Sequence, residues 1–429
     1  MARPIPRAPA SRAPNPGGAR GAALIIVILT VAVLAALAVD LAYNTRVSLQ
    51  IATNARDELR ATYMAKSAVN VARLVLHFQQ KLDDAGTLGT QALSQLGLGG
   101  AAGAAGSASS TPAFSFRLWE IIPVDSTSVA ALLGVRPPEA KPGAKGAPRP
   151  GGPSFQARIE DEDRKVNVPQ LAGLNTVAAP QLQRFLLAVR DPRYDPLFDR
   201  EDENGNRFTR RDVAVNFKDW VDLDSTTSVI GANPAAPFEN GFGDENQLYD
   251  RGDDRYRAKN DRFDSLDELY MVGGVTDSFM SAFGDLLTVY PDVNATTNIN
   301  TDDPEQMMVN VLLMSDPPGI PQPPVLDPAF PAKLNAAIRL ARPLPFMTLG
   351  VAQFASILQA LGVRVQPLFL QAQNSDTRNP FGSRSSTFTI HATGRAGEVE
   401  KNLEAVVTMD GRAGTLASDL GRLIHWRED

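Results

Sequence analysis

The longest hydrophobic pattern of the chain lies near its N-terminus. An uncharged apolar run from Ala22 to Val39 is followed by apolar residues at helical spacing, with no proline or glycine from Asp40 to Ala85. As a helix, the apolar run alone would be about 27 Å long, close to the thickness of the hydrocarbon core of a bilayer. We therefore expect one long helix over 22–83, with its first half in lipid and its second, amphipathic half outside the membrane.

Strand-like patterns lie on both sides of a long middle region. Before it, residues 114–124 alternate well enough for a strand, and residues 155–160 form a second such run. Between them, residues 134–154 are rich in proline and glycine and too poor in apolar residues to pack, so we expect a loop. After the middle region and a helix expected at 348–361, further strands are predicted at 363–371, 386–394, 399–409 and 422–426.

The middle region, from Val166 to about Met314, shows helical spacing in short segments joined by polar, Asp-rich turns. Helices are predicted at 177–190, 209–222, 265–273, 276–289 and 304–314. The residues that follow, 316–345, are rich in proline. Because strands flank this region on both sides, the sequence predicts an α+β fold in which a large α unit is inserted into a sheet domain.

These patterns divide the chain into successive parts. A Gly-, Ala- and Ser-rich linker at 84–112 separates the long helix from the rest of the chain. The parts are a basic leader at 1–21, the helix at 22–83, the first part of the sheet domain at 113–165, the inserted α domain at 166–345 and the second part of the sheet domain at 346–429.

Composition narrows the classes of function. The formal net charge of −6 over 429 residues offers no overall basic field for non-specific binding of nucleic acid. The absence of cysteine rules out disulfides, thiolate metal sites and a cysteine nucleophile. The histidines, His77, His391 and His425, are scattered along the chain, and no GxSxG or HExxH motif is present. We therefore expect that the protein is not an enzyme.

The segment before the apolar run is basic. It contains no acidic residue and carries Arg3, Arg7, Arg12 and Arg20. Basic flanks tend to stay in the cytoplasm, which would leave the chain after Asp40 on the other side of the membrane.

Three interpretations of this N-terminus compete. A secretory signal could be cleaved after Ala36-Leu37-Ala38, or the helix could be an unprocessed anchor. In the third, a prepilin leader ends in Gly21, and cleavage before Ala22 leaves the apolar helix on the mature protein. The long helical pattern after Asp40 favours the third interpretation, because a membrane helix that continues into an amphipathic one is typical of a pilin.

Several segments together resemble one family, the K-type minor pseudopilins of bacterial type II secretion. Their order and spacing carry the resemblance, which runs over nearly the whole chain. The segments are the leader with its Gly21 junction, RIEDEDRKVNV at 158–168, DWVDLD at 219–224, GDENQLY at 243–249, YRAKN at 256–260, SLDELYMVGGVT at 265–276, NINTDDPEQM at 298–307 and LIHWRE at 423–428.

The resemblance implies a pilin-like α/β domain that carries a large inserted all-α domain. It also implies a single-pass protein of the bacterial inner membrane with its C-terminal bulk in the periplasm. Prepilin peptidase would cleave between Gly21 and Ala22, and the new N-terminus would be methylated. The partners would be other minor pseudopilins, with which the protein initiates and caps a pseudopilus, and exported proteins are further candidate partners.

Ile26 departs from the usual pilin pattern. If Ala22 is the first mature residue, Ile26 is the fifth, where most pilins and pseudopilins carry glutamate. A carboxylate in lipid is tolerated when it is paired, and in those proteins its partner is the terminal amine of a neighbouring subunit. An apolar residue here is what the resemblance implies for a subunit at the tip.

Acidic residues gather in the middle region. From Asp195 to Arg255 there are 15 Asp or Glu and 7 Lys or Arg. The two clusters that stand out are Asp219, Asp222 and Asp224, and Asp244, Glu245 and Asp250. Clustered carboxylates in loops repel one another unless a hard cation neutralises them, and Ca²⁺ accepts six to eight oxygen ligands. We expect calcium at these clusters, as the resemblance also implies, although a solvated acidic surface is the simpler alternative.

Two alternative functions stay open at this stage. Residues 265–283 have the form of a helix-hairpin-helix with Gly273-Gly274 at the turn, which could present amides to DNA phosphates on a membrane-tethered receptor. The acidic surroundings favour instead a small helical packing unit and no nucleic acid partner. A minor pilin of a type IV pilus is the other alternative.

Overall fold

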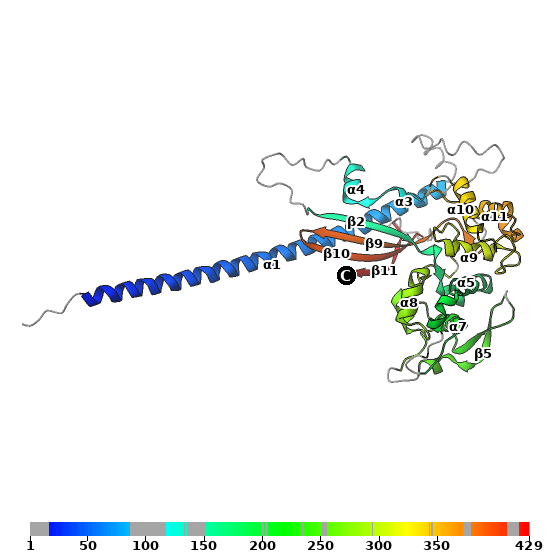
Figure 1. The fold of residues 1–429 in the computed structure, drawn as a ribbon, viewed down its shortest axis with the longest axis horizontal. Coiled ribbons are helices and arrows are strands. Elements are labelled where there is room, and N and C mark those ends of the chain that lie inside the picture. Colours follow the sequence, from blue (N-terminus) through cyan, green and yellow to red (C-terminus); the bar gives the residue numbers. More distant parts are fainter. Residues whose placement is uncertain are drawn as a thin grey trace, which may run out of the picture.

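A long helix, a sheet packed on its second half and a helical unit at its far end make up the molecule in the computed structural model (Figure 1). The structure describes residues 17–85, 117–132, 134, 152–198, 201, 205–233, 236–250, 255–293, 295–342, 344, 346–371, 379–409 and 420–428. Most of the leader and of the loops expected at 84–112 and 134–154 lies outside these residues.

The long helix, α1, spans Gly17–Ala85, as the uninterrupted helical pattern predicts. In its first half, the side chains from Leu24 to Tyr43 are exposed. Its second half packs on the sheet through small residues, among them the fully buried Ala61 and Ala68. A Cβ added to Gly394 of the sheet would lie 2.0 Å from the carbonyl oxygen of Ala61, so the two backbones approach too closely for any other residue.

The sheet has five antiparallel strands in the order β1-β2-β9-β10-β11. Its core side chains, such as Phe388, Ile390 and Ala405, alternate along the strands and face α1. The strands are β1 (Val124–Asp125), β2 (Ser154–Asp161), β9 (Thr387–Ala396), β10 (Val399–Thr408) and β11 (Arg422–Glu428). They come from both ends of the chain, which confirms the predicted α+β fold with an inserted helical unit.

Two predicted strands are wrong. Within 114–124, residues 118–121 form a helical turn, α3 (Leu118–Ile121), followed by α4 (Ser126–Leu132) after β1. The ring of Trp119 packs edge-on against that of Phe388, with 4.9 Å between the ring centroids. The apolar residues of this segment therefore pack on the sheet without forming a strand of it. Within 363–371, Pro367 opens α12 (Pro367–Leu370), and Phe369 packs on Phe381 at 5.6 Å.

The helical unit contains two hydrophobic cores. The turn η2 (Glu162–Arg164) leads from the sheet into this unit. The first core is formed by β3 (Val166–Asn167), η3 (Val168–Ala172), α5 (Asn175–Ala188), η4 (Pro192–Tyr194), α6 (Asp195–Phe198), α7 (Arg210–Val221), β4 (Thr226–Ile230), β5 (Phe238–Asp244), η5 (Glu245–Leu248), η6 (Leu266–Met271), α8 (Asp277–Phe283), η7 (Gly284–Leu286) and β6 (Leu287–Thr288). The second core is formed by α9 (Pro304–Met314), α10 (Phe330–Ala341), α11 (Val351–Ala360), α12, β8 (Phe381–Gly382) and Ile299, which directly follows β7 (Thr297–Asn298).

The helical unit differs from its prediction in several elements. The segments 265–273 and 276–289 contain only short helices, and β6 at the end of the second pairs with β3. The β4–β5 hairpin and α10 were not expected. Helix α10 forms inside the proline-rich segment because Phe330, Leu334 and Ile338 repeat at four-residue spacing and are all buried.

The boundary predicted at 346 is also wrong. Helix α11 lies in the second core with α9 and α10, and β8 pairs with β7, so residues 346–382 belong to the helical unit. The sheet resumes at Thr387. Local pattern could not reveal this, because a helix looks the same in sequence whichever core it covers.

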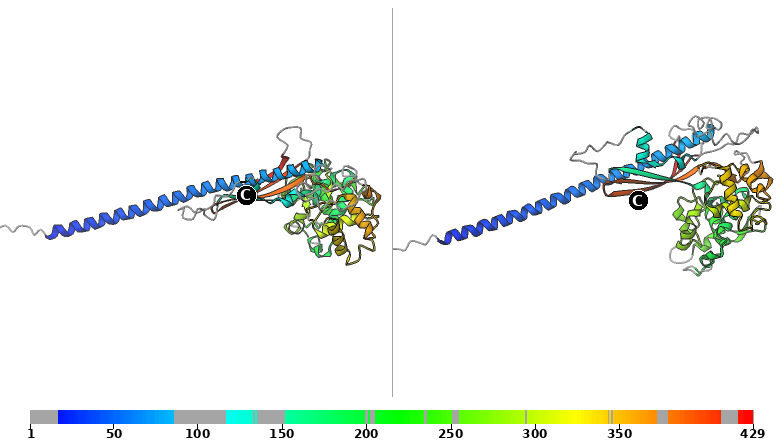
Figure 2. Two further views of the ribbon diagram at one scale, coloured as in Figure 1. Left: turned by 90° about the horizontal axis from the view of Figure 1, so that it is seen from above. Right: turned by 45° about the horizontal axis from the view of Figure 1, so that its top comes forward.

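Buried hydrogen bonds and an ion pair connect the helical unit to the sheet. Asp161 at the end of β2 accepts hydrogen bonds from Asn298 at 3.2 Å and Ser385 at 2.5 Å, and pairs with Arg164 at 2.9 Å. Asp163 accepts hydrogen bonds from the amide and hydroxyl of Ser386 and from the amide of Thr387. All three views place the helical unit at the C-terminal end of α1, to one side of the helix (Figures 1 and 2).

Candidate functional site

Helix α7 supplies two carboxylates of the candidate site. The helix begins with a capping box between Thr209 and Asp212, and buries Phe217 and Trp220 in the first core. Asp219 and Asp222 lie three residues apart, in the last turn and at the C-cap, and therefore project from the same side of the helix.

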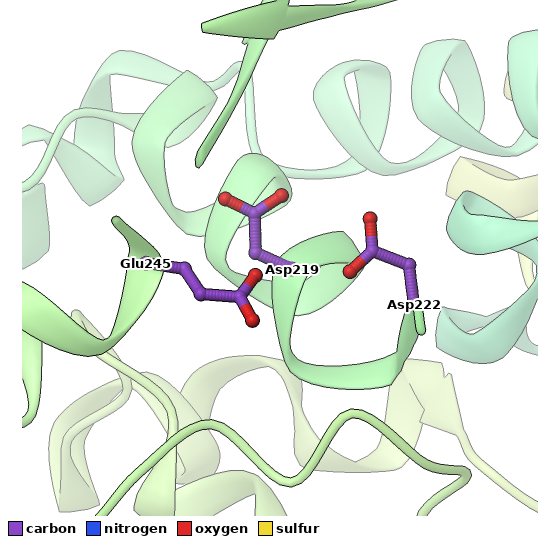
Figure 3. Close-up of side chains that lie close together, drawn as sticks. All are labelled: Asp219, Asp222 and Glu245. Atoms are coloured by element: carbon purple, nitrogen blue, oxygen red, sulfur yellow. The ribbon is translucent and has the colours of Figure 1, made fainter. Parts of the chain in front are cut away.

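The third carboxylate, Glu245, comes from the chain that follows the β4–β5 hairpin. It is the first residue of η5, which Asp244 caps by accepting a hydrogen bond from the amide of Asn246 at 2.9 Å. The hairpin folds back on α7, so Glu245 faces the end of that helix. Carboxylate oxygens of Asp219, Asp222 and Glu245 all lie within 4.8 Å of one another (Figure 3). We call these three residues the acidic cluster.

The acidic cluster is poorly compensated. Both oxygens of Asp219 accept from the amide of Ser228, at 3.2 and 3.0 Å, and Lys218 donates to Asp222 Oδ2. Among the described residues, Asp222 Oδ1 and both oxygens of Glu245 are buried without a hydrogen-bond partner. Three carboxylates thus face one ammonium, and several of their oxygens lack the donors that buried oxygens normally have.

The electrostatic consequence is a set of raised pKa values. Burial raises the pKa of Asp219 and of Asp222, and the ammonium of Lys218 opposes both rises. Burial raises the pKa of Glu245 to about 7; Asn260 opposes this rise, and the charges of Asp222 and Asp219 add to it. A bound cation would favour the ionised carboxylates, because it would neutralise their charge and coordinate their free oxygens.

The residues therefore fit a hard divalent cation such as calcium. Asp219, Asp222 and Glu245 would hold it, and it would supply positive charge that joins α7 to the hairpin. Asp219 and Glu245 also line an open groove of about 580 Å³ between α7 and the β4–β5 hairpin, through which ions can reach the cluster.

Three predicted ligands lie outside the acidic cluster. Asp224 is exposed and accepts from the amide of Thr226 at 2.8 Å, and Asp244 is occupied in capping η5. Asp250 is exposed, 4.0 Å from Arg255. The single site thus takes Asp219 and Asp222 from the first predicted cluster and Glu245 from the second.

Two further residues of the site were missed. The ammonium of Lys218 lies among the carboxylates. Asn260, in the YRAKN segment, has a left-handed backbone with φ 51° and a buried side-chain oxygen without a partner among the described residues. Its amide donates to the carbonyl oxygen of Asp224, so its side chain lies at the edge of the site and could supply a neutral oxygen ligand. An asparagine at a turn in an acidic region was the sequence feature that could have indicated Asn260 as a residue of the site.

The predicted processing and tip residues lie on α1. Gly21 and Ala22 are part of the helix, and Ile26 is exposed together with its apolar neighbours. Helix α1 contains the span that is long and apolar enough to cross a membrane, with none of its apolar window buried inside the protein.

The predicted helix-hairpin-helix motif packs against α7. Its first helix is the 3-10 element η6, and the carbonyl oxygen of Gly273 at the turn accepts from Asn216 at 2.8 Å. A Cβ at Gly274, whose φ is +90°, would lie 2.8 Å from the side chain of Val213. The turn is thus a tight packing contact, which favours the interpretation as a helical packing unit.

The fold is similar to that of a solved structure at low sequence identity. No family model and no curated protein matches the chain. The fold is similar to a chain in the crystal structure of the GspK-GspI-GspJ complex from the enterotoxigenic Escherichia coli type 2 secretion system, at 16% identity and a TM-score of 0.40, covering 65% of this chain and 81% of the other. At this level of similarity, function has to be inferred from the chain's own residues and geometry.

Proposed function

We propose that this protein is a membrane-anchored minor pseudopilin, of the K type that the sequence segments resemble. Helix α1 carries the proposal: its apolar first half is exposed, and its second half is packed on an antiparallel sheet. An exposed apolar helix of this length is stable in a bilayer or in the core of a fibre of like helices, and unstable in water. The anchor would lie in the bacterial inner membrane, with the bulk in the periplasm.

The position that we propose is the tip of a type II secretion pseudopilus. The helical unit lies beside the C-terminal end of α1, at the end of the protein away from the anchor (Figure 2). In a helical fibre of pilin-like subunits, this bulk would occupy space that the next subunit needs. Ile26 supports the same position, because it offers no carboxylate to the amine of an adjacent subunit.

We further propose that the acidic cluster binds calcium. The buried oxygens without partners and the raised pKa of Glu245 support this assignment. The carboxylates come from α7 and from the chain after β5, so their joint use as ligands would hold the hairpin against the first core. The role of the site would be structural.

The assembly test uses the full chain co-expressed with the other minor pseudopilins of its host. We expect a detergent-purified complex with one copy of this chain, and labelled fibres that carry it at one end. Label along the fibre length would overturn the tip position. A deletion strain that loses surface pili and keeps secretion would favour the type IV pilus alternative.

Ile26→Glu tests the tip position at residue level. An unpaired carboxylate in an apolar helix bundle costs several kcal/mol or takes up a proton, so we expect assembly of the variant to fall sharply. Ile26→Leu is the matched control and should assemble normally. Normal assembly of Ile26→Glu would mean that a neighbouring amine is available, as in an ordinary subunit.

A further inference from the structure

Lys218 places a positive charge inside the acidic cluster. Its ammonium donates to Asp222 Oδ2 and, at 2.7 Å, to the hydroxyl of Ser228, and lies 3.8 Å from Asp219 Oδ1. Only 15% of the lysine side chain is exposed. The ammonium is therefore held at the carboxylates instead of pointing into water, as most lysines do.

The contacts of Lys218 join the same elements that the acidic cluster joins. The lysine belongs to α7, Ser228 belongs to β4, and the ring of Phe238 on β5 lies 5.8 Å from the ammonium. Glu245 is not part of this pairing, since both of its oxygens are buried without a hydrogen-bond partner in the part of the chain that the structure describes. One ammonium thus serves Asp219 and Asp222 and leaves the third carboxylate uncompensated.

We propose, on the premise that this site binds calcium, that Lys218 is its built-in counter-cation. It holds Asp219 and Asp222 close to each other in the calcium-free protein and competes with calcium for Asp222. At separations of 4 to 5 Å, an ammonium and a divalent cation repel enough to weaken binding by roughly 15- to 35-fold, even with the full screening of water. Lys218 thereby sets the calcium affinity lower than the three carboxylates alone would give.

The test is Lys218→Met in the full chain purified in detergent, because methionine keeps an unbranched apolar side chain and removes the charge. Calcium is titrated by calorimetry, and thermal unfolding is followed in chelator and in saturating calcium. We expect a dissociation constant at least about tenfold lower than in the wild type. We also expect a lower melting temperature in chelator and a larger rise on adding calcium, because the carboxylates then repel without a counter-ion.

Lys165→Met is the matched control. Lys165 is as buried as Lys218, with 14% of its side chain exposed, and pairs with Glu160 at 2.9 Å and Glu162 at 2.8 Å, away from the acidic cluster. Its loss should lower the melting temperature equally in chelator and in calcium, and leave the dissociation constant unchanged.

The outcomes separate the two proposals. If Lys218→Met behaves like the control, with unchanged calcium affinity, Lys218 is an ordinary structural ion pair and the counter-cation role is overturned while the calcium site stands. If calcium neither binds nor stabilises the wild type, both are overturned. If Lys218→Met does not fold, the neutral variant Lys218→Gln is judged by the same criteria.

Discussion

Buried carboxylates distinguish this protein at the scale of single residues. One group is the acidic cluster, and the other is Asp161 and Asp163, where the helical unit meets the sheet. Asp161 is compensated by Arg164 and by three hydrogen-bond donors, one of which is the amide of Asp163. Asp163 has one oxygen that accepts three hydrogen bonds and one oxygen without a partner among the described residues. The two groups should respond differently to calcium and to pH.

Glu245→Gln tests the acidic cluster. The amide keeps the shape of the side chain and removes the charge, so we expect calcium to bind at least tenfold more weakly, which corresponds to about 1.4 kcal/mol. In the wild type, calcium at a hundred times its dissociation constant should add roughly 2.7 kcal/mol to the free energy of unfolding. Thermal unfolding in calcium and in chelator measures both effects.

Asp250→Asn is the control for that measurement. Asp250 belongs to the same acidic stretch but is exposed and lies outside the cluster. Its substitution should leave the calcium-dependent shift intact. An equal loss in both variants would mean that calcium acts through the overall negative charge and not through a defined site.

Asp163→Asn tests the pH dependence of the junction. Burial and the charge of Asp161 raise the pKa of Asp163, so between about pH 4 and neutral pH the folded protein holds a proton that the unfolded chain releases. The free energy of unfolding should therefore fall as the pH rises through this window. The asparagine variant can still accept the three hydrogen bonds and carries no charge, so its stability should change less with pH. Denaturant unfolding at pH 5 and pH 7.5, in saturating calcium, measures the difference.

A steeper or unchanged pH dependence in Asp163→Asn would show that the wild-type carboxyl is ionised at both pH values. In that case the hydrogen bonds from Ser386 and Thr387 outweigh burial. Saturating calcium is needed in this comparison because Glu245, whose pKa is also raised, would otherwise titrate in the same direction.

At the scale of elements, the contact between α1 and the sheet holds the molecule together. Small side chains on α1 and the bare backbone at Gly394 let the helix and β9 approach closely. Helix α1 would be long and unsupported without this contact, since none of its apolar window is buried by the described part of the protein. The same contact fixes the direction of the anchor relative to the rest of the protein.

Gly394→Ala tests this contact. The new Cβ would lie 2.0 Å from Ala61 O, and neither backbone can shift without breaking the strand or helix, so we expect a loss of about 2 kcal/mol or more. Gly152→Ala, with open space around the added carbon, should change stability little. Chemical unfolding of both variants gives the comparison. A neutral Gly394→Ala would show that α1 lies farther from β9 than the structure places it.

At the scale of the whole molecule, the anchor, the sheet and the helical unit lie in that order along α1 (Figure 1). The proposed membrane anchor therefore lies at one end of the protein, and the helical unit lies at the opposite end. The proposed processing decides whether α1 remains attached, and so whether the protein can enter a fibre at all.

Mass spectrometry of the mature protein tests that processing. We expect an N-terminus at Ala22, methylated, because the basic leader ends at Gly21 directly before the apolar run. The substitution Gly21→Ile should block cleavage and leave the leader attached, while Gly18→Ala should not affect it. A mature chain that begins at Val39 would establish a secretory signal and remove the proposed anchor.

The sequence by itself determined the elements whose patterns are local and long. Helices α5, α7 and α9, the second half of α1 and strands β2, β9 and β10 follow from local periodicity, and the first half of α1 follows from its uninterrupted apolar run. The acidic character of the site and the inserted arrangement of the helical unit could also be read from the chain. Residue order along an element is enough for such features.

Tertiary structure alone decided which of these residues meet. Asp219 and Asp222 are joined by Glu245 and not by Asp224, because the β4–β5 hairpin folds back on α7 and brings η5 to the end of that helix. The counter-charge of Lys218, the position of Asn260 and the placement of α11 in the helical unit depend on packing between distant segments in the same way. Contacts of this kind have no local pattern, since the side chains that make them are separated along the chain and meet only after it folds.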